Sequence, residues 1–445
     1  MTARRVALVC MTPKSDADEL GHLQLPSYGI RRIQAAVVGD RRYAHTVKLV
    51  DLGRDDVGGY VREILAFDPD LVGFSIYVWS TPTLVAVARE IKARSPGCVI
   101  VFGGPSARSA LFDLKYYRHP VAYLDAVVEG DGEIVFRDLA ALADLSRASL
   151  EKVVGLTLPA NGGWLRKPKR SSPADLSAMP SPFDLNLMPA GAVAYLETYR
   201  GCPMSCRFCE WGTPEQIKTV FSVDYIAREL CAFETLQTPA VFLLDAGLNL
   251  NLRAFRNLRE ANRQTGFLKK TLFWAEIYPS VIRDEHYEFL QEIGPSYLGV
   301  GMQSMDQAVL KLHQRPSDSP RFEQAVRDLA TVTSIELQII FGLPGDTPDG
   351  FRRTLDYALS LPASVRVYHC LVLPDALMTR SLKDWDLRFD PLHLAMVSCK
   401  GWSEDAIIGL RSELDRRAVR AGGKHGRYWW SFPRPQPLGT RAIPA

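Results

Sequence analysis

Two long stretches of the chain alternate short apolar runs with segments of helical spacing, and this alternation limits the possible folds more than any other feature. In the first stretch, amphipathic segments such as Pro82–Ser95 separate the apolar runs. These runs are Val6–Cys10, Thr46–Val50, Leu71–Ser75, Val99–Phe102 and Ala126–Val128. Strands that alternate with helices form a parallel sheet covered by helices on both faces. We therefore predict a doubly wound, Rossmann-like α/β domain over residues 1–145.

The second stretch repeats this pattern from residue 191 to about residue 385. Its apolar runs are Ala192–Leu196, Val241–Leu244, Thr271–Ala275, Tyr297–Val300, Glu336–Phe341 and Arg366–Val372, with helical segments such as Val223–Leu236 and Pro320–Val332 between them. Six strand–helix units predict a partial (β/α)6 barrel of the TIM type, in which functional residues follow the C-terminal ends of the strands.

Two further segments lie outside these stretches. Residues 146–190 begin with a predicted β-hairpin, Val153–Arg166, and continue as a Pro- and Ser-rich linker. Residues 386–445 contain a predicted helix, Ser403–Ala421, and then a basic aromatic tail, Lys424–Trp430. The tail either lines a substrate pocket or forms a loosely packed C-terminal region.

The composition narrows the class of protein. The 445 residues are 47% hydrophobic and 23% charged, as in a soluble globular protein. The net charge of +3 gives no electrostatic footprint for nucleic acid, and no apolar run has the length of a membrane span or a signal peptide. Three of the eight cysteines are clustered, which indicates reduced thiols rather than a disulfide framework. We expect a cytoplasmic protein that binds neither nucleic acid nor membranes.

The three clustered cysteines, Cys202, Cys206 and Cys209, directly follow the first strand of the second stretch. Their spacing places three thiolates in one loop, where they can bind three irons of a cubane cluster and leave the fourth iron open. Clusters that only carry electrons are closed by a fourth cysteine, so an open iron indicates a coordination site. The alternatives are a zinc knuckle, for which no second pair of ligands follows, and three unrelated thiols.

With Gly201 before the first cysteine and Phe208 before the last, this loop resembles the radical S-adenosylmethionine (SAM) superfamily. In that family the open iron of a [4Fe–4S] cluster chelates the amino and carboxylate groups of SAM. An electron from the cluster then cleaves SAM to a 5'-deoxyadenosyl radical. The resemblance implies that the three cysteines are the metal ligands. Trp211, just after the loop, either stacks on a cofactor or fills the barrel mouth.

The same resemblance implies contacts to SAM at the ends of the predicted barrel strands. The positions are Phe208 in the cysteine loop; Asp245, Ala246 and Gly247 toward the SAM amino group; Glu276, Gln303 and Ser304 toward its carboxylate or ribose; and Gly342 and Leu373 in turns on the adenine side. Each position also has a purely structural interpretation, as a helix cap or an ordinary turn. The sequence predicts no catalytic acid or base.

Turns after the strands of the first stretch resemble the cobalamin-binding domain of one large radical SAM class. The matching positions are Ser75 and Tyr77 in a Ser-x-Leu-like element, Gly103 and Gly104 in a Gly-Gly element, and Gly130, Gly132 and Glu133 in a Gly-Asp-Gly-Glu run. Cobalamin-binding domains of this class can carry an Asp-x-His-x-x-Gly motif whose histidine ligates cobalt. At that place the chain reads Asp51-Leu52-Gly53-Arg54, and His45 lies before that turn. We therefore expect histidine-off cobalamin. The alternative is a Rossmann-like domain for another ligand or for none, although the G-x-G-x-x-G fingerprint is absent after the first strand.

Together, the two resemblances imply a C-methyltransferase that moves a methyl group from SAM, via methylcobalamin, to an unreactive carbon of a small-molecule or peptide natural-product precursor. They also imply an external electron donor of the flavodoxin or ferredoxin type. One alternative is a cobalamin-dependent radical SAM enzyme that catalyses oxidation or ring rearrangement without methyl transfer. The other is a non-catalytic iron–sulfur or cobalamin carrier, which needs a fourth cluster ligand. Cys231 is the nearest candidate, but its helical setting favours burial as a small apolar side chain.

Overall fold

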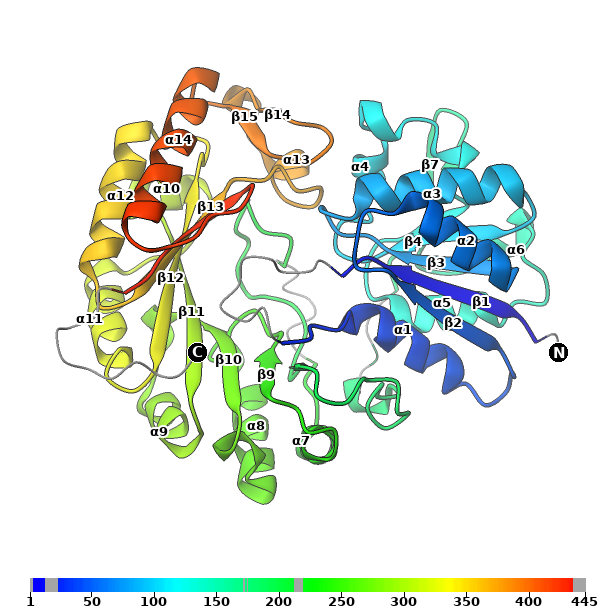
Figure 1. Ribbon diagram of the computed structural model, residues 1–445, viewed down its shortest axis with the longest axis horizontal. Coiled ribbons are helices and arrows are strands. Elements are labelled where there is room, and N and C mark those ends of the chain that lie inside the picture. The colour runs from blue at the N-terminus through cyan, green and yellow to red at the C-terminus, as the bar shows by residue number, and fades with distance from the viewer. Residues whose placement is uncertain (1–2, 13–22, 171–172, 174, 212–218, 435–445) are drawn as a thin grey trace.

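The computed structural model describes residues 3–12, 23–170, 173, 175–211 and 219–434. Parts of the predicted linker and the last residues of the predicted C-terminal region therefore lie outside the described residues. Figure 1 shows two α/β bodies side by side, one coloured blue to cyan and the other green to red. Each is built around one seven-stranded sheet.

The N-terminal sheet has the strand order β2-β1-β3-β4-β5-β6-β7, in which β1 to β5 are parallel and the hairpin β6-β7 is antiparallel. Its elements are β1 (Arg5–Cys10), α1 (Tyr28–Val38), β2 (Thr46–Asp51), α2 (Val57–Phe67), β3 (Leu71–Ser75), α3 (Thr81–Arg94), β4 (Val99–Gly103), α4 (Ser109–Phe112), β5 (Ala126–Val128), α5 (Gly132–Ala140), α6 (Arg147–Leu150), β6 (Leu156–Ala160) and β7 (Gly163–Arg166).

Successive side chains of β1 enter two different cores, because neighbouring residues of a strand point to opposite faces of the sheet. Ala7 and Val9 pack in a core with residues of α2 and α3. Val6 and Leu8 pack in a second core with residues of α1 and α5. The predicted doubly wound domain is confirmed, with α2 and α3 on one face and α1 and α5 on the other.

The second sheet has the order β16-β13-β12-β11-β10-β9-β8, with β8 to β13 parallel and β16 antiparallel to β13. Its elements and those around it are β8 (Ala194–Leu196), α7 (Val223–Thr235), β9 (Ala240–Leu243), α8 (Leu252–Thr265), β10 (Leu272–Ile277), α9 (Asp284–Glu292), β11 (Ser296–Gln303), α10 (Gln307–Leu312), α11 (Ser319–Leu329), β12 (Ser334–Phe341), α12 (Pro348–Ser360), β13 (Ser364–His369), α13 (Leu377–Arg380), β14 (Arg388–Phe389), β15 (Met396–Ser398), α14 (Glu404–Arg420) and β16 (Trp429–Phe432).

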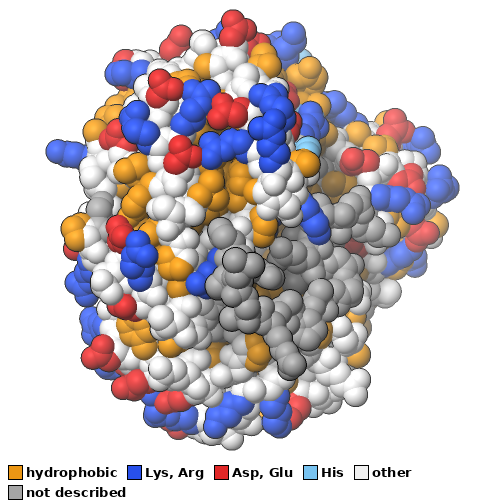
Figure 2. All heavy atoms as spheres, turned by 60° about the vertical axis from the view of Figure 1, so that its left-hand side comes forward, with side chains coloured by type: hydrophobic (Ala, Val, Ile, Leu, Met, Phe, Trp, Pro, Cys, Tyr) orange, Lys and Arg blue, Asp and Glu red, His pale blue; other side chains and the backbone are white. Residues whose placement is uncertain are grey.

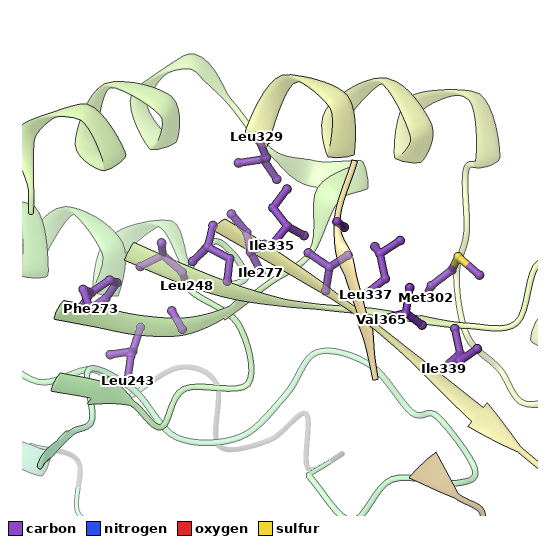
Figure 3. Packing of buried hydrophobic residues seen from close by; sticks show 14 of the residues in the cluster. Leu243, Leu248, Phe273, Ile277, Met302, Leu329, Ile335, Leu337, Ile339 and Val365 are labelled. Carbon is purple, nitrogen blue, oxygen red and sulfur yellow. The ribbon is translucent and has the colours of Figure 1, made fainter. Parts of the chain in front are cut away.

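A single core lies between this sheet and its helices. In Figure 3, Ile335 and Leu337 of β12 point toward the helical layer, and Leu329 of α11 lies above them. The intervening residues of β12, such as Glu336 and Gln338, alternate onto the inner face of the sheet. The predicted partial barrel of six parallel strands is confirmed.

Two segments that the sequence leaves outside both sheets extend them. The hairpin β6-β7 lengthens the N-terminal sheet through β5, and β16 from the aromatic tail pairs with β13 of the barrel. Trp430 of β16 is buried in the barrel core. The tail residues Trp429–Phe432 are therefore an ordered edge strand rather than a loosely packed segment.

One face of the molecule shows the mixed charge that the balanced composition implies (Figure 2). On the face shown in Figure 2, acidic and basic side chains are interspersed. Within the described parts of the chain, no helix is both long enough and apolar enough to span a bilayer.

Candidate functional site

The cysteine loop connects β8 to the segment that leads to α7. Cys202 and Cys206 are buried, and Cys209 is half-buried. The Cys209 N–H donates to the Cys206 carbonyl at 3.1 Å, and the Trp211 N–H donates to Cys209 Sγ at 3.4 Å. Burial raises the pKa of the Cys209 thiol to about 11, since an uncompensated thiolate is poorly solvated there. A bound metal ion removes that penalty by coordinating the thiolate.

Arg315 supplies a positive charge beside this loop. Its Nη1 lies 4.0 Å from Cys206 Sγ, and its Nη2 donates to the Gly301 carbonyl at the end of β11. Its guanidinium carbon lies 4.7 Å from the ring centre of Tyr278, which follows β10. Three neighbouring parts of the barrel thus fix one cation next to the thiols. This cation favours thiolates and an anionic ligand at the same place.

Two features beside the thiols suit a bound cluster: the guanidinium of Arg315 near Cys206, and the Trp211 N–H that donates to Cys209 Sγ. Hydrogen bonds to sulfur, like that from the Trp211 N–H, are among the features that tune such clusters. The three cysteines therefore fit the predicted cluster.

Asp245 holds the backbone that leads into the cysteine loop. Its Oδ1 accepts from the Thr198 N–H at 2.8 Å and from the Tyr199 N–H at 3.4 Å, and its Oδ2 accepts from the Thr198 hydroxyl. Burial raises the pKa of the Asp245 carboxyl to about 7. The Tyr199 hydroxyl also donates to the Gly247 carbonyl at 2.9 Å. Asp245 is not the cap of α8, because Asn251 caps that helix.

Glu276 lies on the inner face of the barrel. Its Oε1 accepts from Gln338 Nε2 at 3.1 Å, and burial raises the pKa of its carboxyl to about 7. A Cβ atom on Gly299 of the neighbouring strand would overlap the Glu276 carboxylate, so a larger residue there would displace this side chain. Gln303 ends β11 in a β-bulge with a φ of +66°. Such strained residues concentrate at binding sites.

The other predicted SAM contacts are more scattered. Ser304 Oγ lies 3.5 Å from Thr354 Oγ1 of α12 and accepts from the Asp306 N–H. Phe208 packs 5.7 Å from the ring of His313. The remaining three are Ala246, which is half-buried, Gly342, which has a φ of +86°, and Leu373, which packs against the N-terminal core.

A cavity of about 180 Å³ lies beside Arg315, and Ser304 is the predicted SAM contact that lines it. Its lining includes Tyr278, Gly301, Ser304 and Arg315. The guanidinium beside Cys206 therefore also borders a cavity at the ends of β10 and β11.

On the N-terminal domain, the predicted cobalamin residues follow the ends of β3, β4 and β5. Ser75 is buried, and Gly103 ends β4. Gly104 has a φ of +97°, and a Cβ atom there would lie 2.8 Å from the Ile76 carbonyl. Glycine is required here because the two turns touch through their backbones.

An aromatic pair borders the same edge. The ring of Tyr77 stacks on that of Trp79 at 4.5 Å, and Trp79 Nε1 donates to the Met11 carbonyl after β1. Trp79 is 45% exposed. Trp79 is thus a large exposed aromatic side chain at the ligand edge that its sequence position did not single out.

The Gly130–Glu133 turn reaches the second domain. Gly130 has a φ of +157°, and a Cβ atom on Gly132 would lie 2.9 Å from Ile33 Cδ1. The Glu133 carboxylate pairs with Arg200 at 2.6 Å and with Arg32 at 3.5 Å. Burial alone would raise the Glu133 pKa, but these two guanidinium groups lower it below its usual range. The Glu133 side chain thus links the domains, and its contact with cobalamin stays a prediction.

Two further residues considered in the sequence, His45 and Cys231, lie outside these turns. His45 accepts from the Arg4 N–H just before β2, which is the opposite end of the strand from the ligand edge. Cys231 is exposed on α7, so the predicted burial of its side chain was wrong. Within the described residues, no contact connects Cys231 to the cysteine loop.

Comparison with protein families gives two matches in the order that the fold suggests. The B12 binding domain matches residues 23–140, and the radical SAM superfamily matches residues 196–358. The first region is the doubly wound domain, and the second contains the cysteine loop and most of the barrel. The chain belongs to the cobalamin-binding radical SAM enzymes.

Several curated relatives carry names of methyltransferases. The 2-(S-pantetheinyl)-carbapenam-3-carboxylate methyltransferase of Streptantibioticus cattleyicolor is 29% identical over 69% of this chain and 48% of its own length. The cobalamin-dependent radical SAM methyltransferase TokK of Streptomyces tokunonensis is 27% identical over 79% of this chain and 54% of its own. The hopanoid C-3 methylase of Methylococcus capsulatus is 26% identical over 71% and 61%. The chain thus spans about half to three-fifths of the length of these relatives.

Solved structures share the fold. The radical SAM methyltransferase TsrM of Kitasatospora setae superposes with a TM-score of 0.68 and 17% identity, covering 93% of this chain and 89% of TsrM. The cobalamin-dependent SAM radical enzyme OxsB superposes with a TM-score of 0.62 and 15% identity, covering 97% of this chain and 64% of OxsB.

Proposed function

We propose that this protein is a C-methyltransferase that takes a methyl group from SAM and passes it through cobalamin to an unreactive carbon of a small-molecule or peptide natural-product precursor. The names of the curated relatives support methyl transfer. The observation that carries the proposal is the direct contact between the turn after β5 and the start of the cysteine loop, at Glu133 and Arg200. Two predicted cofactor regions thereby share one interface.

When bound, the [4Fe–4S] cluster would supply electrons and a chelating iron for SAM, and cobalamin would supply a methyl carrier. Cys202, Cys206 and Cys209 would hold the cluster. Arg315 is placed to receive an anionic group next to that cluster, because its guanidinium already lies 4.0 Å from Cys206 Sγ. We assign it to the carboxylate of SAM, which a guanidinium binds through charge-assisted hydrogen bonds.

Glu276 and Gln303 would complete the SAM site from the inner face and the end of the barrel strands. A carboxyl with a pKa of about 7 is able to accept a hydrogen bond from an amino or hydroxyl group without a full permanent charge in the barrel. Asp245 and Gly247 would not contact SAM directly, because their polar groups form hydrogen bonds with Thr198 and Tyr199. Their part is to hold the start of the cysteine loop.

The turns at Ser75, Tyr77, Gly103, Gly104, Gly130 and Gly132 would bind cobalamin. The glycines let a large planar ligand approach the backbone at the ligand edge of the sheet, and the stacked Tyr77 and Trp79 offer it an aromatic surface. We propose histidine-off binding, which the place of His45 at the opposite end of β2 supports.

The proposed reaction requires a source of electrons. We propose an external electron donor of the flavodoxin or ferredoxin type and a cytoplasmic setting. The described cysteines are all free thiols, as expected in a reducing compartment.

The test is anaerobic reconstitution with iron, sulfide and hydroxocobalamin, followed by incubation with SAM and a reductant and mass spectrometry of the products. S-adenosylhomocysteine together with 5'-deoxyadenosine, from protein that retains cobalamin, supports a radical methyltransferase. S-adenosylhomocysteine alone indicates polar methyl transfer. Deoxyadenosine alone contradicts methyl transfer and favours oxidation or rearrangement. The absence of both products favours a carrier.

A pair of cysteine variants provides the matched control. Cys209→Ala removes a proposed iron ligand and should abolish both products. Cys231→Ala removes an exposed thiol on α7 and should leave both unchanged.

A further inference from the structure

Both ends of the cysteine loop are tied to the N-terminal domain. At the start of the loop, Arg200 lies two residues before Cys202 and pairs with Glu133 at 2.6 Å. Arg200 also pairs with Asp131 of the same turn at 3.3 Å and with Glu197 at 3.0 Å. The side chains of Arg200 and Glu133 are only 10% and 8% exposed. A buried pair with several hydrogen bonds holds its partners in one geometry more strictly than a surface pair does.

A second arginine strengthens this first tie. Arg32 of α1 lies 3.5 Å from Glu133 and 4.0 Å from Glu197. It also donates to the Tyr225 hydroxyl of α7 at 2.7 Å. The tie therefore joins two elements of the N-terminal domain, α1 and the turn after β5, to two segments of the barrel.

At the other end of the loop, Glu210 directly follows Cys209 and accepts from the Asp375 N–H at 3.1 Å. The Asp375 carboxylate pairs with Arg108 of the N-terminal domain. Arg108 in turn donates to the Gly104 carbonyl at 3.2 Å. This second tie ends on the turn after β4, at one of the predicted cobalamin residues.

We propose that Arg200 and Glu210 are positioning residues, which couple occupation of the cobalamin turns to the conformation of the cysteine loop. The proposal rests on the proposed function, because it takes the turns after β4 and β5 as the cobalamin site. The two ties meet the loop on either side of its three cysteines and end on those two turns. A ligand that orders the turns therefore also orders both ends of the loop, and a break in one tie releases that end.

The experiment is amide hydrogen exchange with mass spectrometry on the full, cluster-reconstituted chain, with and without hydroxocobalamin. We expect cobalamin to slow exchange in the turns at residues 103–105 and 129–133 and also in the cysteine loop at residues 199–211. In Arg200→Gln, the turns should keep their protection, while protection of the loop falls about tenfold. Arg200→Lys, which retains the charge but loses the planar fork, should restore part of it.

The matched control is Lys92→Met, which removes another partly buried ion pair of the same domain, Lys92 with Asp125 at 2.7 Å. It should leave the response of the loop unchanged. If Arg200→Gln does not fold, as judged by circular dichroism, Arg108→Gln tests the second tie, since the Asp375 side chain is 38% exposed and tolerates the change better.

Three results would overturn the proposal. If cobalamin protects the turns but not the loop of the unchanged protein, the coupling is absent while the cobalamin site stands. If the loop of Lys92→Met loses as much protection as that of Arg200→Gln, the effect is general destabilisation. If cobalamin protects neither region, the cobalamin assignment fails together with the coupling.

Discussion

Replacing Asp245 with asparagine should stabilise the barrel at neutral and alkaline pH. Asp245 is 4% exposed, and burial raises the pKa of its carboxyl from 3.8 to about 7, even though Thr198 and Tyr199 hydrogen bonds oppose the rise. At about 1.36 kcal/mol per pH unit, ionising this group in the folded protein costs about 4 kcal/mol above pH 7.

The sign of the pH dependence follows from proton binding. Folded protein binds the Asp245 proton more tightly than unfolded protein, so its stability falls as pH rises from about 4 to about 7. The Asp245→Asn variant has no such loss. Its amide oxygen can still accept from the Thr198 N–H, and its amide N–H can donate to the Thr198 hydroxyl. The free energy of unfolding of Asp245→Asn, relative to that of wild type, should therefore rise by about 3 kcal/mol between pH 5 and pH 8.

The assay is urea unfolding of the apo-protein at several pH values, followed by fluorescence. Asp245→Ala is the control, because it leaves the Thr198 N–H and Tyr199 N–H without their acceptor. It should be less stable than asparagine at every pH, by about 1–3 kcal/mol for each lost partner. A difference between wild type and Asp245→Asn that stays constant from pH 5 to pH 8 would refute the assigned pKa shift.

Three further predictions concern the cofactor residues. Cys209→Ala should lose most of its iron on reconstitution, whereas Cys231→Ala should retain it, as measured by iron analysis and absorbance. Arg315→Gln should weaken SAM binding by about 10- to 100-fold, the loss expected for about 1.5–3 kcal/mol of charge-assisted hydrogen bonding, and calorimetry showing unchanged affinity would contradict this role. Gly104→Ala should cost about 1–3 kcal/mol of stability, because φ is +97° and the new Cβ atom meets Ile76, and gel filtration should show lower cobalamin retention.

Much of the fold could be predicted because its information is local. The strand Leu71–Ser75 was predicted with the bounds that the structure has, and Val99–Phe102 was one residue short of β4. Both are short runs of apolar residues buried on both faces of a parallel sheet, so their composition alone marks them. The three cysteines are similarly local, since the proposed ligand set lies within eight residues.

The missed parts depend on contacts between distant residues. Arg315 lies 109 residues from Cys206, in a segment without a recognisable motif. The pair Glu133 and Arg200 is separated by 67 residues and joins two domains. The strand Trp429–Phe432 pairs with β13 across more than sixty residues, and its bulky aromatics gave no sign of which sheet they would join.

Cys231 shows a different limit. A helix over Val223–Leu236 was predicted from its spacing, one residue longer than α7, but which face of the helix carries the cysteine depends on how the helix packs on the sheet. In the structure Tyr225, Ile226, Glu229 and Leu230 face inward, and Cys231 lies outside that stripe.

The most direct test of the central claim follows the methyl group itself. Cluster-reconstituted, cobalamin-loaded protein is reduced and incubated with SAM that carries a fully deuterated methyl group, and the cobalamin is extracted and analysed by mass spectrometry. The proposed function predicts cobalamin that carries the deuterated methyl group, in wild type and in Cys231→Ala but not in Cys209→Ala. Cobalamin that stays unlabelled in wild type, while 5'-deoxyadenosine accumulates, would contradict methyl transfer by this protein.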